Sequence, residues 1–389
     1  MPRAIWALGF TSLLMDVSSE AIHALLPLYL TGVLGLSTAT LGLIEGAAEG
    51  LTQATKIFSG AFSDWLGRRK LPAMIGYGLA ALTKPAFALA VTPAPIVAAH
   101  IVDRIGKGVR GAPRDALIAD LTPEGQRGAA YGLRQALDTI GGVIGPLAAV
   151  WIMLASGDNY RLVFGLACLP ALAAVLILFL FVPADSASNR VAAFPLSAAA
   201  ARRLPAAFWT VVALGAGMAM ARIAEAFLVL RATGLGLDVA YAPSVLIGMS
   251  VVYGMAAYPA GALADTAAPR ALVAFAFVSL ALAEATLAAA NGLLVVFVGI
   301  AIWGAHMALS QGLLAKLVAD RAPPDLRGTA FGLFNLANAL GILVGNAVFG
   351  AIWSSAGAAT AYGCAAVFAA LVAGLTLASP EKIFREPAA

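Results

Sequence analysis

The sequence has little charge, and this scarcity restricts what the chain can be. Charged residues make up 11% of its 389 residues, whereas hydrophobic residues make up 61%, and the mean hydropathy is +0.91. A soluble domain of this length cannot bury so much apolar surface. The composition therefore predicts an all-α integral membrane protein.

Catalytic and metal-binding motifs are missing as well. The motifs HExxH and GxSxG and a nucleotide-binding loop do not occur in the sequence, so we expect no enzyme activity and no cofactor. The two cysteines, Cys168 and Cys364, lie in apolar segments and are interpreted as core residues rather than a disulfide. The three histidines, His23, His100 and His306, are scattered singly along the chain and are only weak metal candidates.

Long hydrophobic runs are what the sequence does have. A bilayer core about 30 Å thick needs roughly 20 apolar residues per helix. Runs of this kind indicate eleven spans, at residues 4–33, 38–63, 71–91, 127–155, 160–182, 206–233, 239–264, 271–290, 293–318, 327–355 and 360–378.

An internal repeat predicts a twelfth span. DLTPEGQRGAAYGLRQALDTIGGVIGPL, from Asp120, returns 200 residues later as DRAPPDLRGTAFGLFNLANALGILVGNAV, from Asp320. In this register the charged segment DRIGKGVRGAPRD, residues 103–115, aligns with an apolar span, so we predict that it is the fourth helix. The predicted parts are an N-terminal six-helix bundle (1–182), a cytoplasmic linker (183–205), a C-terminal six-helix bundle (206–379) and a cytoplasmic tail (380–389).

The basic residues between the predicted spans gather on one side of the membrane. Arg161 and Arg231 fall on the opposite side, and the positive-inside rule therefore places both termini in the cytoplasm. The rule also accounts for most of the net charge of +4 without nucleic-acid binding. We expect a monomer in the cell (inner) membrane. The bases on the cytoplasmic side are Arg68, Arg69, Lys70, Arg127, Arg202, Arg203, Arg270, Arg321 and Arg327.

Twelve helices in two repeated halves resemble the major facilitator superfamily (MFS) of secondary transporters, whose halves are related by a pseudo-two-fold axis. GAFSDWLGRRK, between the second and third spans, is similar to the loop motif of that family, and GALADTAAPR repeats it in the second half. The resemblance implies a cytoplasmic conformational latch. Its predicted residues are Gly60, Asp64, Gly67, Arg68, Arg69 and Asp265.

Two shorter motifs resemble the drug/proton antiporter branch of that family, which implies export. They are RIGKG at residues 104–108 and GGVIGPLAA at residues 141–149. Both depart from the pattern of the branch, because Lys107 stands where Gln is usual and Ala149 replaces a glycine.

The charges of the fourth span share one face. At 100° per residue, Asp103, Lys107, Arg110 and Arg114 lie within about 60° of one another. The first span carries Asp16, Glu20 and His23 at similar depth. The resemblance implies that these two helices line a central cavity together with the seventh and tenth. An unpaired charge in lipid costs several kcal/mol, so these residues must pair or face water.

Two interpretations of these charges stay open. In the first, the opposite charges only neutralise one another, and Arg110, Arg114 and Asp115 hold loops together. In the second, Asp16 or Glu20 exchanges a proton, and Arg104 or Lys107 stabilises its charged form. The repeat favours the second, because the counterparts of four fourth-helix charges in the C-terminal half carry no charge. These counterparts are Trp303, Gly304, Met307 and Ser310.

The predicted function is proton-coupled secondary active transport of a small organic solute with an anionic group, by alternating access and with efflux favoured. The alternatives are an uptake symporter, or an exporter of a metal or a siderophore-like metal chelate; a receptor or an intramembrane enzyme is a third class. The expected partners are the substrate, protons and the lipid bilayer. The predicted proton-coupling residues are Asp16, Glu20 and Arg104, and the predicted substrate-binding residues are Lys107, Arg110, Glu45, Glu49, Arg134, Arg222, Glu225, Trp303 and His306.

Overall fold

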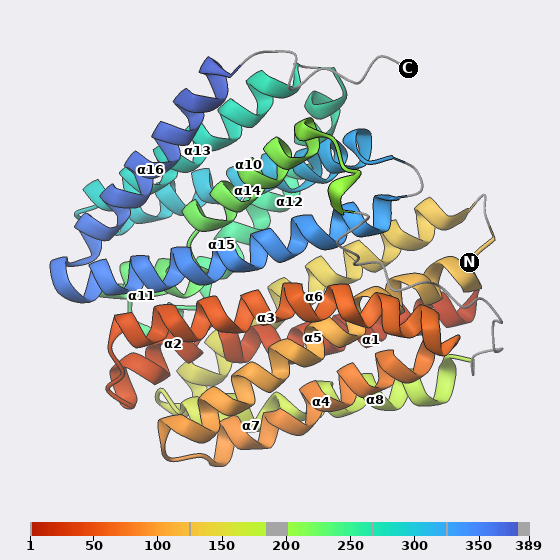
Figure 1. The fold of residues 1–389 in the computed structure, drawn as a ribbon. Coiled ribbons are helices and arrows are strands. Elements are labelled where there is room, and N and C mark those ends of the chain that lie inside the picture. The colour runs from red at the N-terminus through yellow and green to blue at the C-terminus, as the bar shows by residue number, and fades with distance from the viewer. Residues whose placement is uncertain (1, 124–125, 184–200, 267, 324–325, 380–389) are drawn as a thin grey trace. The chain divides into compact units, whose positions relative to one another are not determined.

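The structure is a computed structural model that describes residues 2–123, 126–183, 201–266, 268–323 and 326–379 (Figure 1). Every element in the described residues is an α-helix, except for one short π-helix and one short 3-10 helix. In chain order they are α1 (Arg3–His23), α2 (Leu26–Leu28), the π-helix η1 (Tyr29–Val33), α3 (Thr38–Leu66), α4 (Lys70–Leu89), α5 (Pro93–Leu121), α6 (Arg127–Ser156), α7 (Tyr160–Leu166), α8 (Cys168–Phe181), α10 (Ala206–Ala221), α11 (Glu225–Gly234), the 3-10 helix η3 (Val239–Tyr241), α12 (Ser244–Thr266), α13 (Pro269–Ala289), α14 (Leu293–Arg321), α15 (Arg327–Ala356) and α16 (Ala358–Ala378).

Twelve membrane-length spans result when the interrupted helices are joined, as predicted: α1 to η1, α7 with α8, α10 with α11, and η3 with α12. Within the described residues, nine of these are both long and apolar enough to cross a membrane by composition alone. The other three are α3, α4 and α5. The charged fourth helix, α5, is a continuous helix of 29 residues, so the repeat identified a span that its composition conceals.

The helices pack as two compact units. Unit 1 holds residues 1–36, 51–194 and 238–247, and unit 2 holds residues 37–50, 195–237 and 248–389. The long helix α3 therefore contributes its first turns to unit 2 and the remainder to unit 1.

Close helix packing in both units depends on glycine. In unit 1, a Cβ on Gly145 of α6 would lie 2.7 Å from the carbonyl oxygen of Val17 on α1. In unit 2, a Cβ on Gly345 of α15 would lie 2.2 Å from the carbonyl oxygen of Met220 on α10. Real Cβ atoms do not approach a backbone oxygen so closely, so these positions let the two backbones touch. Small residues at helix contacts are typical of membrane helices.

Both units contain a span in which one helix ends and another begins after a short break. In unit 1, α1 ends at His23, and the chain resumes at Leu26 before a π-helical turn. In unit 2, α10 ends at Ala221 and α11 begins at Glu225. The backbone N–H of Ala224 in this second break donates to Oδ1 of Asn346, at 2.6 Å. Interrupted membrane helices persist where neighbouring side chains satisfy the freed backbone groups in this way.

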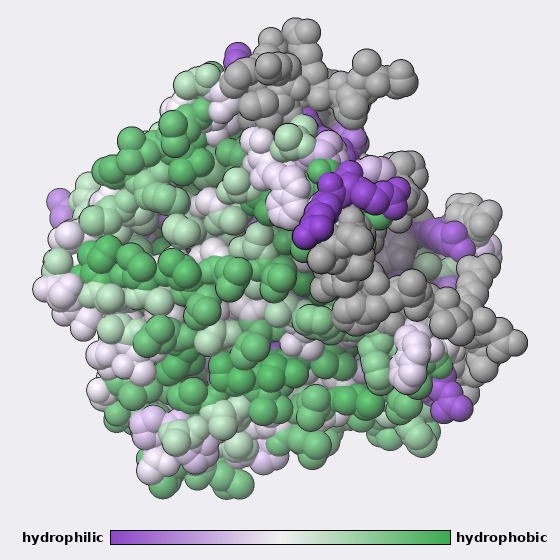
Figure 2. All heavy atoms as spheres, viewed as in Figure 1, coloured by the Kyte–Doolittle hydropathy of each residue, from purple (hydrophilic) through white to green (hydrophobic). Residues whose placement is uncertain are grey.

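Large apolar side chains point outward from many of the helices. Figure 2 shows a face dominated by hydrophobic residues. Leu82 and Leu89 of α4 are 78% and 77% exposed, and Leu371 of α16 is 62% exposed. So much exposed apolar surface is unfavourable in water and favourable in lipid. The protein is a multi-pass membrane protein.

Candidate functional site

A buried ion pair joins α4 to α5 in unit 1. The Lys84 ammonium group donates to Oδ1 of Asp103 at 2.8 Å and to Oγ of Ser19 on α1 at 3.0 Å. Lys84 and Asp103 are almost fully buried, so the two charges are compensated inside protein rather than by water. Removal of either partner would leave an uncompensated buried charge, which is strongly unfavourable.

His23, the last residue of α1, connects this pair to a second set of charges. Its Nε2 lies 3.4 Å from Oδ2 of Asp103, and its Nδ1 lies 3.8 Å from Oε1 of Glu20. Arg104 places Nη2 3.2 Å from the same Nδ1 atom. The His100 ring meets the His23 ring edge to face, with centroids 5.4 Å apart. A single imidazole therefore contacts two carboxylates and one guanidinium group.

One turn before Glu20 on α1, Asp16 faces Arg110 of α5, with Oδ1 3.9 Å from Nη2. The Arg110 guanidinium also lies over the Tyr77 ring at 4.8 Å, a cation–π contact. Lys107 interacts electrostatically with both Asp16 and Glu20. The structure therefore brings the predicted helix 1 carboxylates together with cationic side chains of α5, and it also places Arg104 3.2 Å from His23.

A further cluster joins α5 to α6. Arg134 donates to Asp115 at 2.9 Å and to Asp138 at 2.7 Å. Arg114 donates to Asp115 at 3.1 Å and to Oγ of Ser12 at 2.8 Å. Arg134, predicted to bind substrate, is thus held by Asp138 on its own helix and by Asp115 on α5.

These side chains form one array, which we call the N-terminal charge network. With its carboxylates and bases ionised and His23 neutral, it holds five negative and six positive charges. Asp16 and Glu20 are 21% and 23% exposed, whereas Lys84 and Asp103 are sealed inside. The network is made of Asp16, Glu20, His23, Lys84, Asp103, Arg104, Lys107, Arg110, Arg114, Asp115, Arg134 and Asp138.

Lys84 is one of the members that the sequence analysis did not assign to the site, together with Asp103, Arg114, Asp115 and Asp138. A signal for it exists, because α4 and α5 form an antiparallel hairpin across residues 90–92. Lys84 lies six positions before this turn and Asp103 eleven after it, an offset of about 7.5 Å along the helices that a long lysine side chain can span. A base and an acid placed so, in spans with few charges, are candidates for a pair.

In unit 2, the predicted residues gather at the break between α10 and α11. Arg222 lies in this break. It interacts electrostatically with the carboxylates of Glu225 on α11 and Glu49 on the first turns of α3, and with Tyr253 of α12. Glu45 lies one turn before Glu49 on the same helix.

Trp303 and His306 on α14 are both buried, with exposed fractions of 1% and 0%. Nδ1 of His306 lies 2.8 Å from the carbonyl oxygen of Ala276 and 3.3 Å from Oγ of Ser279, both on α13. These contacts attach His306 to the neighbouring helix of unit 2.

The predicted latch is described only in part, because the side chains of Asp64 and Asp265 lie outside the described residues. Gly67 has φ +64°, a left-handed conformation that suits glycine and ends α3. Beside it, Nη1 of Arg69 donates to Ser63, and Oγ of Ser63 donates to the carbonyl oxygen of Arg68.

Two residues of the loop motif contact α5. Nε of Arg69 lies 3.4 Å from Asp120, and a Cβ on Gly60 would contact Ala112 at 3.3 Å. The loop motif therefore connects the end of α3 to α5.

The three metal candidates are divided between the units. His23 and His100 are neighbours in unit 1, whereas His306 belongs to unit 2. Among the residues that the structure describes, no group of three His, Cys, Asp or Glu side chains is arranged to hold a metal ion.

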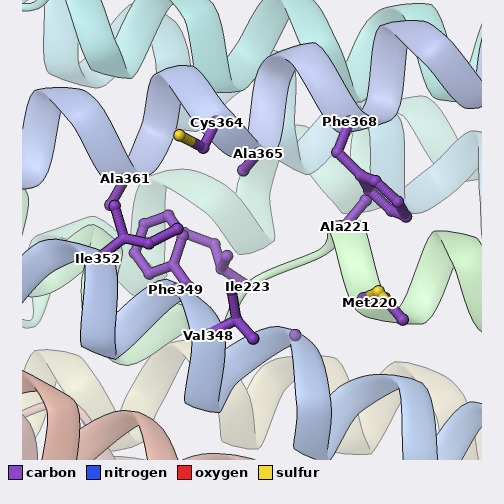
Figure 3. A pocket seen from close by; sticks show the side chains of 11 residues that line it. Met220, Ala221, Ile223, Val348, Phe349, Ile352, Ala361, Cys364, Ala365 and Phe368 are labelled. Atoms are coloured by element: carbon purple, nitrogen blue, oxygen red, sulfur yellow. The ribbon is translucent and has the colours of Figure 1, made fainter.

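A cavity of about 160 Å³ lies in unit 2 beside the helix break (Figure 3). Met220, Ala221 and Ile223 line it from the break, Phe349 from α15, and Phe368 from α16. Its whole lining is uncharged, so it suits an apolar group rather than an ionised one.

Comparisons with known proteins agree with this architecture. The sequence profile of the Major Facilitator Superfamily matches residues 8–346 and 223–386. An uncharacterised MFS-type transporter of Methanocaldococcus jannaschii is 26% identical over 362 residues, covering 91% of this chain and 89% of the relative. Multidrug resistance protein MdtH of Photorhabdus laumondii is 29% identical over 144 residues, covering 37% of this chain and 36% of MdtH.

Among solved structures, a mutant of the peptide transporter POT in complex with sulfate has the same fold. Its TM-score is 0.84 at 15% sequence identity, covering 99% of this chain and 96% of that one. Twelve helices, the repeat and a family profile that spans most of the chain lead to one conclusion. The protein belongs to the major facilitator superfamily and is a secondary transporter, not an enzyme.

Proposed function

We propose that the protein is a proton-coupled transporter of a small organic solute that carries an anionic group. Proton exchange takes place in the N-terminal charge network, where Asp16, Glu20 and Arg104 are the coupling residues. Lys107 and Arg110 attract the anionic group. Unit 2, taken by itself, offers the Arg222 cluster and an uncharged cavity.

One observation carries the proposal. The N-terminal charge network lies on membrane-spanning helices, contains one more positive than negative charge, and leaves Asp16 and Glu20 partly exposed. Isolated charges in lipid are unfavourable, and ionisable side chains at membrane depth typically mark ion or substrate pathways. Partly exposed carboxylates can exchange protons with water, and an excess cation attracts an anion.

Flux in proteoliposomes tests the proposal. A library of organic anions, cations and metal chelates is first screened for thermal stabilisation of the purified protein, and a stabilising anion is then used as substrate. We expect Asp16→Asn and Glu20→Gln to abolish accumulation driven by a pH gradient while exchange of labelled for unlabelled substrate survives. Arg104→Ala should damage both processes. Full gradient-driven accumulation in both carboxylate variants would mean that the charges are structural.

Export by proton antiport is a second candidate function. The partial similarity to multidrug resistance protein MdtH favours it, as do the two antiporter-like motifs. Reversal of the pH gradient distinguishes proton antiport from proton symport, because a symporter and an antiporter accumulate substrate under gradients of opposite sign.

A further inference from the structure

Lys56 of α3 is a cation on a membrane-spanning helix that lies beside the N-terminal charge network. It belongs to the part of α3 in unit 1, and its side chain is exposed. Within the described residues its ammonium group makes no hydrogen bond and no ion pair. A charge on a membrane helix must pair with another charge or face water, so this lysine requires an explanation.

Close packing of α3 on α5 fixes the position of the Lys56 side chain. A Cβ on Gly108 of α5 would lie 2.6 Å from the carbonyl oxygen of Thr52 and 3.3 Å from the backbone nitrogen of Lys56. Oγ of Ser59 donates to the carbonyl oxygen of Gly108 at 3.0 Å. One turn further, a Cβ on Gly111 would lie 3.5 Å from Cε of Lys56. The lysine stem therefore lies directly against α5, which places its ammonium group beside the charges of α5 and α6.

Most of the charges around Lys56 have the same sign as its own. It interacts electrostatically with Lys107, Arg114 and Arg134, and with the carboxylate of Asp115. Asp115 already accepts hydrogen bonds from Arg114 and Arg134. A single negative charge shared by two arginines does not also neutralise Lys56.

Lys107 of α5 is in the same situation. It is partly exposed, and within the described residues it makes no hydrogen bond and no ion pair, although it interacts electrostatically with Asp16 and Glu20. Lys56 and Lys107 are thus neighbouring ammonium groups that lack a described ion pair. The cations of the network that have a described ion pair with an aspartate are Lys84, Arg110, Arg114 and Arg134.

The charge count agrees with this geometry. With Lys56 included and His23 neutral, seven positive charges accompany five negative ones. The excess of two positive charges matches the two lysines that lack a described ion pair. Because uncompensated charge on membrane helices is unfavourable, a ligand with two negative charges is the partner that restores neutrality.

The second half of the chain lacks both lysines. Lys107 corresponds to Met307, and the stretch of α12 that matches Lys56 holds Ala256 and Ala257. Since these helices form without cations at the matching positions, the fold does not require a lysine at either place.

We propose that Lys56 and Lys107 together bind two negative charges of the substrate, and that the transporter is selective for small organic dianions such as dicarboxylates and phosphate monoesters. Ammonium groups suit this role, because each is a compact charge with three rotatable donors on a flexible stem. The inference rests on the proposed function and narrows its substrate class from an anion to a dianion.

Matched pairs of ligands that differ by one charge test the selectivity. The pairs are succinate with monomethyl succinate, terephthalate with monomethyl terephthalate, and phenyl phosphate with methyl phenyl phosphate. Affinities for the full-length protein are measured by thermal shift at about pH 8, where a phosphate monoester carries two charges. We expect each dianion to bind about tenfold more tightly than its partner, the factor that a hydrogen bond to a charged group typically contributes. Equal affinity within every pair, or no binding of any dianion, overturns the inference.

Substitution of the lysines tests the assignment of residues. Lys56→Gln and Lys107→Gln should each abolish the preference for dianions, whereas Lys56→Arg should keep it because the charge remains. Arg161→Gln is the control, since it removes a positive charge from α7, outside the network, and should leave the preference unchanged. A preference that survives in both glutamine variants contradicts the assignment.

The stability of the ligand-free protein separates binding from a structural role. Removal of one of two neighbouring cations relieves repulsion, so Lys56→Gln should leave the melting temperature unchanged or raise it. A lower melting temperature would mean that Lys56 stabilises the fold, and would contradict its assignment to the substrate.

A lipid headgroup offers the same chemistry, because phosphatidate also carries a phosphate monoester. The ligands are therefore compared in nanodiscs of phosphatidylcholine with and without phosphatidate. We expect the same dianion affinity in both. Competition by phosphatidate that disappears in Lys56→Gln would assign the lysines to lipid and overturn their assignment to a solute.

The inference and the proposed function fail separately. Selective binding of dianions without any gradient-driven flux contradicts the proposed function alone. Gradient-driven flux of a monoanion, with equal affinities within every ligand pair, contradicts the inference alone.

Discussion

The two halves of the chain carry different side chains at matching positions. Lys84 on α4 and Asp103 on α5 correspond, 200 residues later, to Glu284 on α13 and Trp303 on α14. The first pair is a buried salt bridge of 2.8 Å. Glu284 and Trp303 are also buried, yet within the described structure the Glu284 oxygens and the Trp303 Nε1 have no hydrogen-bond partner. The α4–α5 and α13–α14 helix hairpins thus share a backbone arrangement, but the first buries a salt bridge and the second buries side chains that have no described hydrogen bond.

The same contrast extends along α5 and α14. Arg104 corresponds to Gly304, which packs directly on the backbone of α12 in unit 2, where a Cβ would lie 2.7 Å from the carbonyl oxygen of Met249. Arg110 corresponds to Ser310. Because one half folds into six helices without these charges, the helical bundle itself does not require them. From this comparison we propose that the charges of α5 serve something other than packing of the bundle.

Among the substitutions that test this comparison, disruption of the Lys84–Asp103 pair should cause the largest loss of stability. Lys84→Met leaves Asp103 buried without its closest cation, so we expect a loss of about 3–5 kcal/mol in stability. Thermal unfolding of the purified protein, followed by tryptophan fluorescence, measures the loss.

The double variant Lys84→Met with Asp103→Leu sharpens the same comparison. It replaces both charges with apolar groups, as in a hydrophobic helix hairpin, and should return stability to within about 1 kcal/mol of the parent protein. Gradient-driven transport should stay impaired, because His23 then lacks Asp103. Recovery of transport along with stability would show that the pair serves packing alone.

Substitution of the helix-contact glycines should cause an intermediate loss of stability, of similar size in both halves. Gly145→Ala on α6 and Gly345→Ala on α15 each place a methyl group against a backbone carbonyl oxygen. We expect losses of about 1–3 kcal/mol in each case, because overpacked helices must move apart. The same unfolding measurement applies.

Gly142 supplies the control for that prediction. A Cβ at this position meets no atom within 4 Å, so Gly142→Ala should be neutral or stabilising by up to about 1 kcal/mol through helix propensity. A loss at Gly142 as large as that at Gly145 would mean that helix contact is not the cause.

Glu284→Gln should have the smallest effect. The substitution keeps the shape of the side chain and breaks no described hydrogen bond, so we expect stability to change by less than about 1 kcal/mol. Transport should be unchanged. A strong transport defect with normal folding would indicate that the second half also carries a coupling carboxylate, and would weaken the contrast between the halves.

Much of the fold was predictable from the sequence, because hydrophobic length and the 200-residue repeat are local or periodic signals. The run from 160 to 182 is apolar enough to be recognised directly, and α5 was recognised only through its counterpart at 293–318. Helical spacing also predicted that the α1 stripe and the α5 stripe each form one face. The tertiary structure, however, determined that Arg104 contacts His23 and that Asp16 faces Arg110.

By itself, the sequence determined the membrane environment, the twelve spans, the two homologous halves and the helices that carry charge, since each depends on composition and period along one chain. Only the tertiary structure decided which charges meet. Lys84 and His23 lie 61 positions apart in the sequence, on different helices, and both contact Asp103. Helix rotation and the break after His23 bring them together, and these depend on contacts between helices that no local pattern encodes.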